Sequence, residues 1–146
     1  MRFTRSDLAL LALRLVLGTA FVVHGYPKIQ HPLTWPEHAL PGVPGWLAAV
    51  SAVIEFVGGI ALVVGFLTRL VAFSIAADMV VAIFFVLVPH GAPFVSEAGG
   101  PSFELPLTYL VVGFALVMMG AGAISLDGLR EGDRRGGKIG TRTRRR

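Results

Sequence analysis

Three ionisable side chains lie inside stretches of sequence that are otherwise apolar. Arg14, Glu55 and Asp78 each have mostly aliphatic or aromatic neighbours on both sides. A charge in such surroundings is costly, so residues of this kind normally face the interior of a helix bundle and pair. The planar guanidinium of one arginine carries five donors and can hold two carboxylates. We therefore expect Arg14, Glu55 and Asp78 to form an inner polar cluster.

Two interpretations of this inner cluster fit the residue types. It could be a structural ion cluster that fixes how the helices lie against one another. It could also handle protons or anchor a ligand, because two carboxylates that share one cation leave one of them readily protonated.

A second polar group lies near the other ends of the apolar stretches and consists of His24, Lys28, His90 and Glu104. His24 and Lys28 are four residues apart, so they share one face of a helix. We expect the four residues to rim an outer mouth, where a histidine could donate to a carbonyl oxygen of a quinone headgroup. The alternative is that they simply extend towards the water at the interface.

Metal and covalent cofactor chemistry has little support in the sequence. The chain has no cysteine, which excludes disulfides and thiolate metal sites. A haem between His24 and His90 is disfavoured because both histidines lie at the edge of the apolar region. A di-iron site is disfavoured because no helix carries a Glu-x-x-His pair. We expect no metal and no covalently bound cofactor, and quinone is the cofactor that the residues suit best.

Four apolar stretches must position these residues, and they are residues 8–26, 46–66, 70–88 and 105–124. A helix of about 20 residues is about 30 Å long, which matches the hydrocarbon core of a bilayer. Because backbone polar groups need partners inside lipid, each stretch should be a helix. The composition agrees, since 54% of residues are hydrophobic and 15% are charged. We predict an all-α, integral membrane four-helix bundle with antiparallel neighbours.

The distribution of basic residues predicts the orientation. Arg2 and Arg5 precede the first stretch, Arg69 lies between the second and third, and eight Lys and Arg residues follow Leu129. The loops on the other side offer only Lys28. By the positive-inside rule, both termini face the cytoplasm of a bacterial plasma membrane. We expect residues 1–127 to form the transmembrane domain and residues 128–146 to form a disordered basic tail that could bind soluble partners.

The order and spacing of several segments resemble the DoxX family of small bacterial membrane proteins. The resemblance covers about residues 8–127 and rests on no single motif. It is carried by Arg14 to Gly18, His24-Gly25, Lys28, Glu55 to Gly59, Thr68-Arg69, Phe103 to Leu107 and Gly120 to Asp127. The family pattern matches at Arg14, His24, Lys28, Glu55, Arg69 and Glu104.

The resemblance implies a plasma-membrane protein linked to redox metabolism. Relatives are subunits of a terminal quinol oxidase, act in thiosulfate:quinone oxidoreduction, or tether soluble detoxifying enzymes. The leading hypothesis is therefore a membrane subunit or accessory of a quinone-linked oxidoreductase, enzymatic only as part of that complex. Two alternatives stay open: a non-catalytic scaffold that recruits soluble redox enzymes, and a small transporter. The transporter is less favoured because the first helix carries Arg14 where small multidrug transporters carry an acid. No sequence feature indicates nucleic-acid binding, and a homo- or hetero-oligomer stays open.

Overall fold

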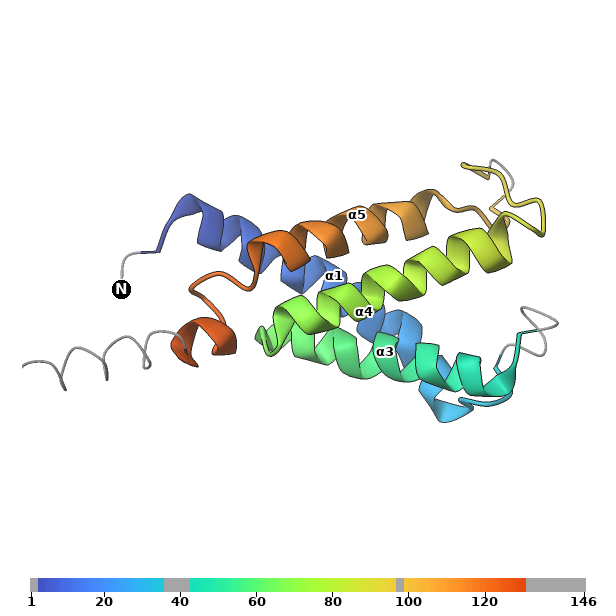
Figure 1. The fold of residues 1–146 in the computed structure, drawn as a ribbon, viewed down its shortest axis with the longest axis horizontal. Helices are drawn as coiled ribbons and strands as arrows, with labels where there is room; N and C mark the ends of the chain where they lie inside the picture. Colours follow the sequence, from blue (N-terminus) through green and yellow to red (C-terminus); the bar gives the residue numbers. More distant parts are fainter. Residues whose placement is uncertain (1–2, 36–42, 97–98, 131–146) are drawn as a thin grey trace, which may run out of the picture.

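The computed structural model describes residues 3–35, 43–96 and 99–130. These residues form a bundle of four long helices (Figure 1). The helices are α1 (Arg5–Gln30), α3 (Gly45–Val64), α4 (Thr68–Val81), which continues as the π-helical segment η1 (Ala82–Leu87), and α5 (Glu104–Met119). The described residues contain no strand. The all-helical expectation is confirmed, whereas most of the expected tail lies outside the described residues.

Helix α1 is longer at both ends than the predicted stretch of residues 8–26. Its start is fixed by a reciprocal capping box, in which Thr4 accepts from the backbone N–H of Asp7 and the Asp7 carboxylate accepts from that of Thr4. The helix continues through Pro27 to Gln30, four residues beyond the predicted end at residue 26. Proline costs a helix one backbone hydrogen bond, but packing against neighbouring helices lets membrane-type helices tolerate it.

Helices α3 and α4 are joined by a tight turn. Gly65 ends α3 with φ of 71°, and the Phe66 N–H donates to the Ala61 carbonyl across the turn. Leu67 then adopts φ of 48° before α4 begins at Thr68. The predicted second stretch, residues 46–66, therefore runs two residues too far. The predicted third stretch, residues 70–88, corresponds to α4 and η1 together.

Helix α5 ends five residues before the predicted end at residue 124. Gly120 and Gly122 both have positive φ, which turns the chain out of the helix direction. The chain then forms a short helical turn over residues 126–130. The apolar composition of residues 120–124 reflects burial against other helices instead of helix continuation.

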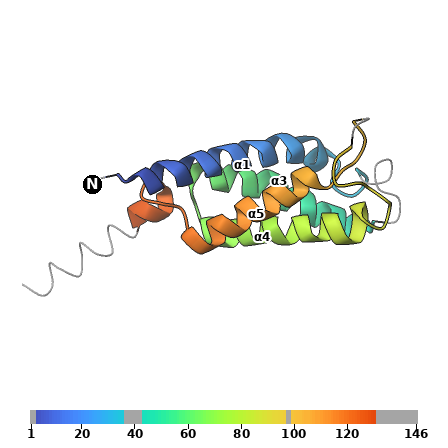
Figure 2. The same ribbon diagram turned by 90° about the horizontal axis from the view of Figure 1, so that it is seen from above.

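The helices pack chiefly in two pairs, α1 with α3 and α4 with α5, and α3 joins the pairs by packing on α4. Figures 1 and 2 show both described ends of the chain and the α3–α4 turn at one end of the bundle, called here the terminal end. The connections before α3 and before α5 lie at the other end, called here the loop end. The core consists of Leu10, Leu17, Phe21, Leu62, Ala72, Ile75, Met79 and Leu116.

The outer surface of the bundle is strongly apolar. Large hydrophobic side chains are more than half exposed on every helix, for example Val16, Val57, Phe73 and Phe114. A water-soluble monomer rarely exposes so much contiguous apolar area. Three helices are long and apolar enough to cross a membrane, Arg5–Gln30, Gly45–Val64 and Thr68–Phe85, and α5 is a shorter apolar helix. The structure thus has the surface of a membrane helix bundle.

Candidate functional site

The expected inner cluster of Arg14, Glu55 and Asp78 does not form, and this prediction is corrected by the structure. Arg14 donates through Nη2 to the Ile124 carbonyl oxygen, 2.5 Å away, at the terminal end. A Cβ added to Gly65 would clash with the Arg14 guanidinium, so the α3–α4 turn also lies against it. Arg14 therefore fastens the segment after α5 to the bundle and is not between the two carboxylates.

Lys28 takes the place that Arg14 was expected to fill. Its Nζ lies 2.5 Å from Glu55 Oε1, an ion pair between α1 and α3. The Ser51 hydroxyl lies 3.5 Å from the same carboxylate oxygen and 3.2 Å from Asp78 Oδ2 on α4. Lys28, Ser51, Glu55 and Asp78 thus join three helices, and we call them the polar cluster.

The glycines of α1 and α3 explain this arrangement. A Cβ at Gly18 would lie 2.7 Å from the Gly59 carbonyl oxygen, and one at Gly25 would lie 2.5 Å from the Phe56 nitrogen. The two helices are therefore antiparallel, and moving forward along α1 corresponds to moving back along α3. Lys28, just beyond Gly25, reaches Glu55, whereas Arg14, just before Gly18, lies against Gly65 at the end of α3.

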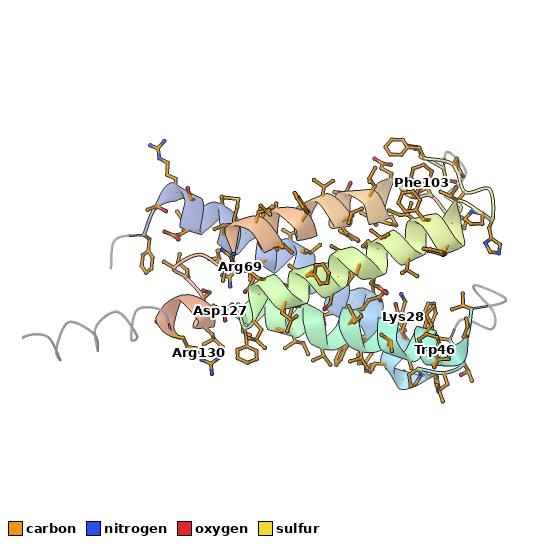
Figure 3. All side chains as sticks on the ribbon, viewed as in Figure 1. Lys28, Trp46, Arg69, Phe103, Asp127 and Arg130 are labelled. Atoms are coloured by element: carbon orange, nitrogen blue, oxygen red, sulfur yellow. The ribbon has the colours of Figure 1, made fainter. Side chains whose placement is uncertain are left out.

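The distance between the two cations follows from the same helix. Arg14 and Lys28 are fourteen residues apart in the sequence, which is about 21 Å along a helix axis. Figure 3 shows Lys28 towards the loop end, while Arg69 and Asp127 mark the terminal end. Because Glu55 pairs with Lys28, Arg14 lies too far along α1 to pair with the same carboxylate.

The polar cluster is largely shut off from the surroundings. The Glu55 side chain is 5% exposed and that of Lys28 is 24% exposed. Lys28 Nζ also lies 4.5 Å from the centre of the Trp35 ring, which is a cation–π geometry. The Trp35 indole N–H donates to the Ala48 carbonyl oxygen at 3.0 Å and so fixes the ring beside Lys28.

One carboxylate oxygen of the polar cluster is unusual. Within the described part of the chain, Glu55 Oε2 is buried and has no hydrogen-bond partner. A buried carboxylate oxygen usually accepts at least one hydrogen bond, so an unpaired one marks a place where a proton or a polar ligand could bind.

The residues of the expected outer mouth do not all gather around Lys28. Lys28 turns inward to Glu55, while the exposed His24 has its ring 6.3 Å from that of Tyr109 on α5. Glu104 begins α5 with an exposed side chain, and His90 is exposed in the connection after η1. Of this predicted group, Lys28 is the residue that joins the polar cluster.

Two members of the site were not predicted as site residues. Ser51 lies one helical turn before Glu55, and this spacing could have indicated it. Trp35 lies in the connection after α1, and no feature of the sequence linked it to Lys28. Among the described residues, no group of three His, Cys, Asp or Glu side chains could hold a metal ion.

Comparison with known proteins decides the family. The DoxX family model matches residues 9–88, which is more than half of the chain. The chain belongs to the DoxX family. The matched region of this DoxX protein contains most of α1 and all of α3, α4 and η1, and it includes all four residues of the polar cluster.

Several curated proteins are similar to this DoxX protein over most of their length. An uncharacterized protein of Haemophilus influenzae is 36% identical over 79% of this chain and 85% of its own. The Bacillus subtilis protein named "Putative oxidoreductase CatD" is 31% identical over 83% of this chain and 86% of its own. The Escherichia coli protein named "Inner membrane protein YqjF" is 29% identical over 85% of this chain and 93% of its own. No solved structure matches the chain.

Proposed function

We propose that this DoxX protein is the membrane subunit of a quinone-linked oxidoreductase, and that its polar cluster receives the quinone headgroup. The observation that carries the proposal is the Lys28–Glu55 ion pair, extended through Ser51 to Asp78, between helices that are otherwise apolar. Ionisable groups at such positions usually mark a pathway or a binding site. The name of the relative CatD supports the redox part of the proposal.

The chemistry of the polar cluster suits a quinone. A quinone has two carbonyl oxygens that accept hydrogen bonds, a flat ring and an apolar tail. The Lys28 ammonium is a strong donor, and the Trp35 ring beside it offers a flat apolar surface. The exposed apolar helix surface would accept the tail. In this proposal a partner enzyme supplies the electrons, because quinone reduction requires an electron donor.

The membrane arrangement belongs to the same proposal. All four helices cross the plasma membrane as antiparallel neighbours, with the terminal end in the cytoplasm and the loop end outside. Helix α5 has 16 residues and is about 24 Å long, and modest local thinning of the bilayer would accommodate it. The name of the relative YqjF, an inner membrane protein, supports this location.

A thermal-shift experiment tests the quinone proposal. The full chain in mild detergent is titrated with a short-chain ubiquinone or menaquinone analogue, and the unfolding temperature is followed. A ligand at 100 times its Kd stabilises the folded state by about 2.7 kcal/mol, so a saturable rise of several degrees is expected. Trp35→Leu should reduce the rise, because it removes the flat ring.

Arg14→Met is the matched control, since Arg14 lies at the terminal end and should not affect the analogue. If neither analogue raises the unfolding temperature of the native chain at saturating concentration, the quinone proposal is wrong. An equal rise in the native chain and in Trp35→Leu would remove Trp35 from the site.

A further inference from the structure

The polar cluster contains more acidic than basic groups. Among the described residues, Glu55 and Asp78 provide two carboxylates, and Lys28 provides the ammonium that pairs with them. If all three groups were ionised, the cluster would carry one uncompensated negative charge. An unpaired charge away from water is far more costly than protonating the group.

Ser51 lies between the two carboxyl groups, and its position fits a proton shared between them. Its oxygen lies within hydrogen-bond distance of Asp78 Oδ2, at 3.2 Å, and of Glu55 Oε1, at 3.5 Å. A serine hydroxyl has a single hydrogen, so it can donate to only one of these oxygens at a time. The other contact is a hydrogen bond only if that carboxyl group carries its own proton and donates to Ser51.

Lys28 decides which of the two acids carries the proton. Its ammonium lies 2.5 Å from Glu55 and favours the ionised form of that residue. Asp78 is half-buried and interacts unfavourably with the negative charge of Glu55. We infer that the polar cluster is a binding site for one exchangeable proton, which rests on Asp78 and reaches Glu55 through Ser51.

The other neighbours of Asp78 do not alter this charge balance. Glu55 on α3 and Lys28 on α1 are the charged groups that interact with it electrostatically. Helix α5, which also packs on α4, carries two titratable residues. These are Tyr109, whose ring contacts Phe21 and His24, and the exposed Glu104. The η1 segment carries no titratable residue.

Movement of the proton needs no other group of the chain. The Asp78 carboxyl passes its proton to the Ser51 oxygen while the Ser51 hydroxyl proton passes to Glu55. Ser51 thus gains one proton and loses one, and it remains a neutral hydroxyl. The destination rests on the proposed function: reduction of a quinone to a quinol consumes two electrons and two protons. The electrons come from the electron donor in the partner enzyme, the polar cluster supplies one proton, and water supplies the other.

Infrared difference spectroscopy of the full chain in liposomes at neutral pH tests the proton site, because a protonated carboxyl group has its own C=O stretching band. The native chain should show the band of one buried carboxyl group. Asp78→Asn and Glu55→Gln should both abolish it, since each leaves one acid to balance Lys28. Lys28→Met should double it, because both acids must then be neutral.

Ser51→Ala is the matched variant that keeps the charge balance. It should keep the band but slow its shift in deuterated buffer, because the connection between the two carboxyl groups is lost. Helix content measured by circular dichroism shows that each variant is folded. A native chain without the band, or a band that survives in folded Asp78→Asn, would overturn the proposal.

The proton site and the quinone site can fail separately. The infrared band is measured without quinone, so its presence without any thermal shift would leave the proton site standing and remove the quinone. A thermal shift without the band would support the quinone site and remove the proton site.

Discussion

At the scale of single residues, two cations of α1, Arg14 and Lys28, have different partners. Lys28 balances a carboxylate among three helices, whereas Arg14 holds a backbone carbonyl of the segment that follows α5. The difference follows from position along one helix and not from the chemistry of the side chains. Either cation could have paired with Glu55 had the register allowed it.

Asp127 is the residue that joins the segment after α5 to the start of α4. Its two carboxylate oxygens accept from the backbone N–H groups of Leu67 and Thr68, at 3.0 Å and 2.8 Å. Its own N–H donates to the Gly65 carbonyl oxygen. Asp127 therefore caps a helix that comes from a distant part of the chain.

Asp127→Ala should lower the free energy of unfolding by about 1–2 kcal/mol, the usual cost of losing a helix cap. Denaturant unfolding in mild detergent, followed by circular dichroism, measures the change. Asp127→Asn, which retains one acceptor oxygen, should lose less. If the alanine variant unfolds at the same denaturant concentration as the native chain, the two hydrogen bonds contribute nothing to stability.

At the scale of helices, the close contact of α1 with α3 sets where every polar residue lies. Gly18 and Gly59 bring the two backbones together, and Gly25, seven residues further along α1, does so nearer the loop end. Small residues allow such an approach because no side chain separates the helices. This contact places Lys28 beside Glu55 and Ser51.

Two adjacent glycines of α3 provide a direct test of this contact. A Cβ at Gly59 would lie 2.7 Å from the backbone nitrogen of Val22, whereas one at Gly58 would lie 3.2 Å from a methyl group of Val71. Gly59→Ala should lower the free energy of unfolding by about 1–3 kcal/mol, because backbone cannot move aside as a side chain can. Gly58→Ala should change it by less than about 1 kcal/mol.

Both variants gain the same helix propensity from alanine, so the difference between them reports packing alone. Denaturant unfolding of both variants in detergent measures this difference in the free energy of unfolding. Neither variant alters a residue of the polar cluster. Equal stability of the two variants would contradict the register described above.

At the scale of the whole molecule, the two ends of the bundle differ in charge. The described part of the terminal end contains Arg5, Arg69 and Arg130, whereas Lys28 near the loop end is neutralised by Glu55. This asymmetry supports the proposed orientation, since basic loops stay in the cytoplasm.

Single cysteines can test the orientation without background, because the chain has none. We expect a membrane-impermeant maleimide to label exposed Thr34→Cys in intact spheroplasts. Ser6→Cys and Leu129→Cys, which are exposed at the terminal end, should react only after permeabilisation. Labelling of Ser6→Cys or Leu129→Cys in sealed cells would reverse the proposed topology.

The sequence by itself determined the helical class, the approximate positions of the four rods and the presence of costly charges between them. These properties depend on local composition and helix length, which are written in short windows of the chain. Family membership, expected from the order and spacing of segments along residues 8–127, is confirmed by the DoxX match.

Only the tertiary structure decided which charges meet. The choice between Arg14 and Lys28 as the partner of Glu55 depends on how α1 and α3 lie along each other, and glycine contacts between their backbones set this alignment. The path of the chain after Gly120 likewise depends on hydrogen bonds from Arg14, Asp7 and Asp127 to or from distant segments. Such contacts join residues far apart in the sequence, so no local pattern could specify them.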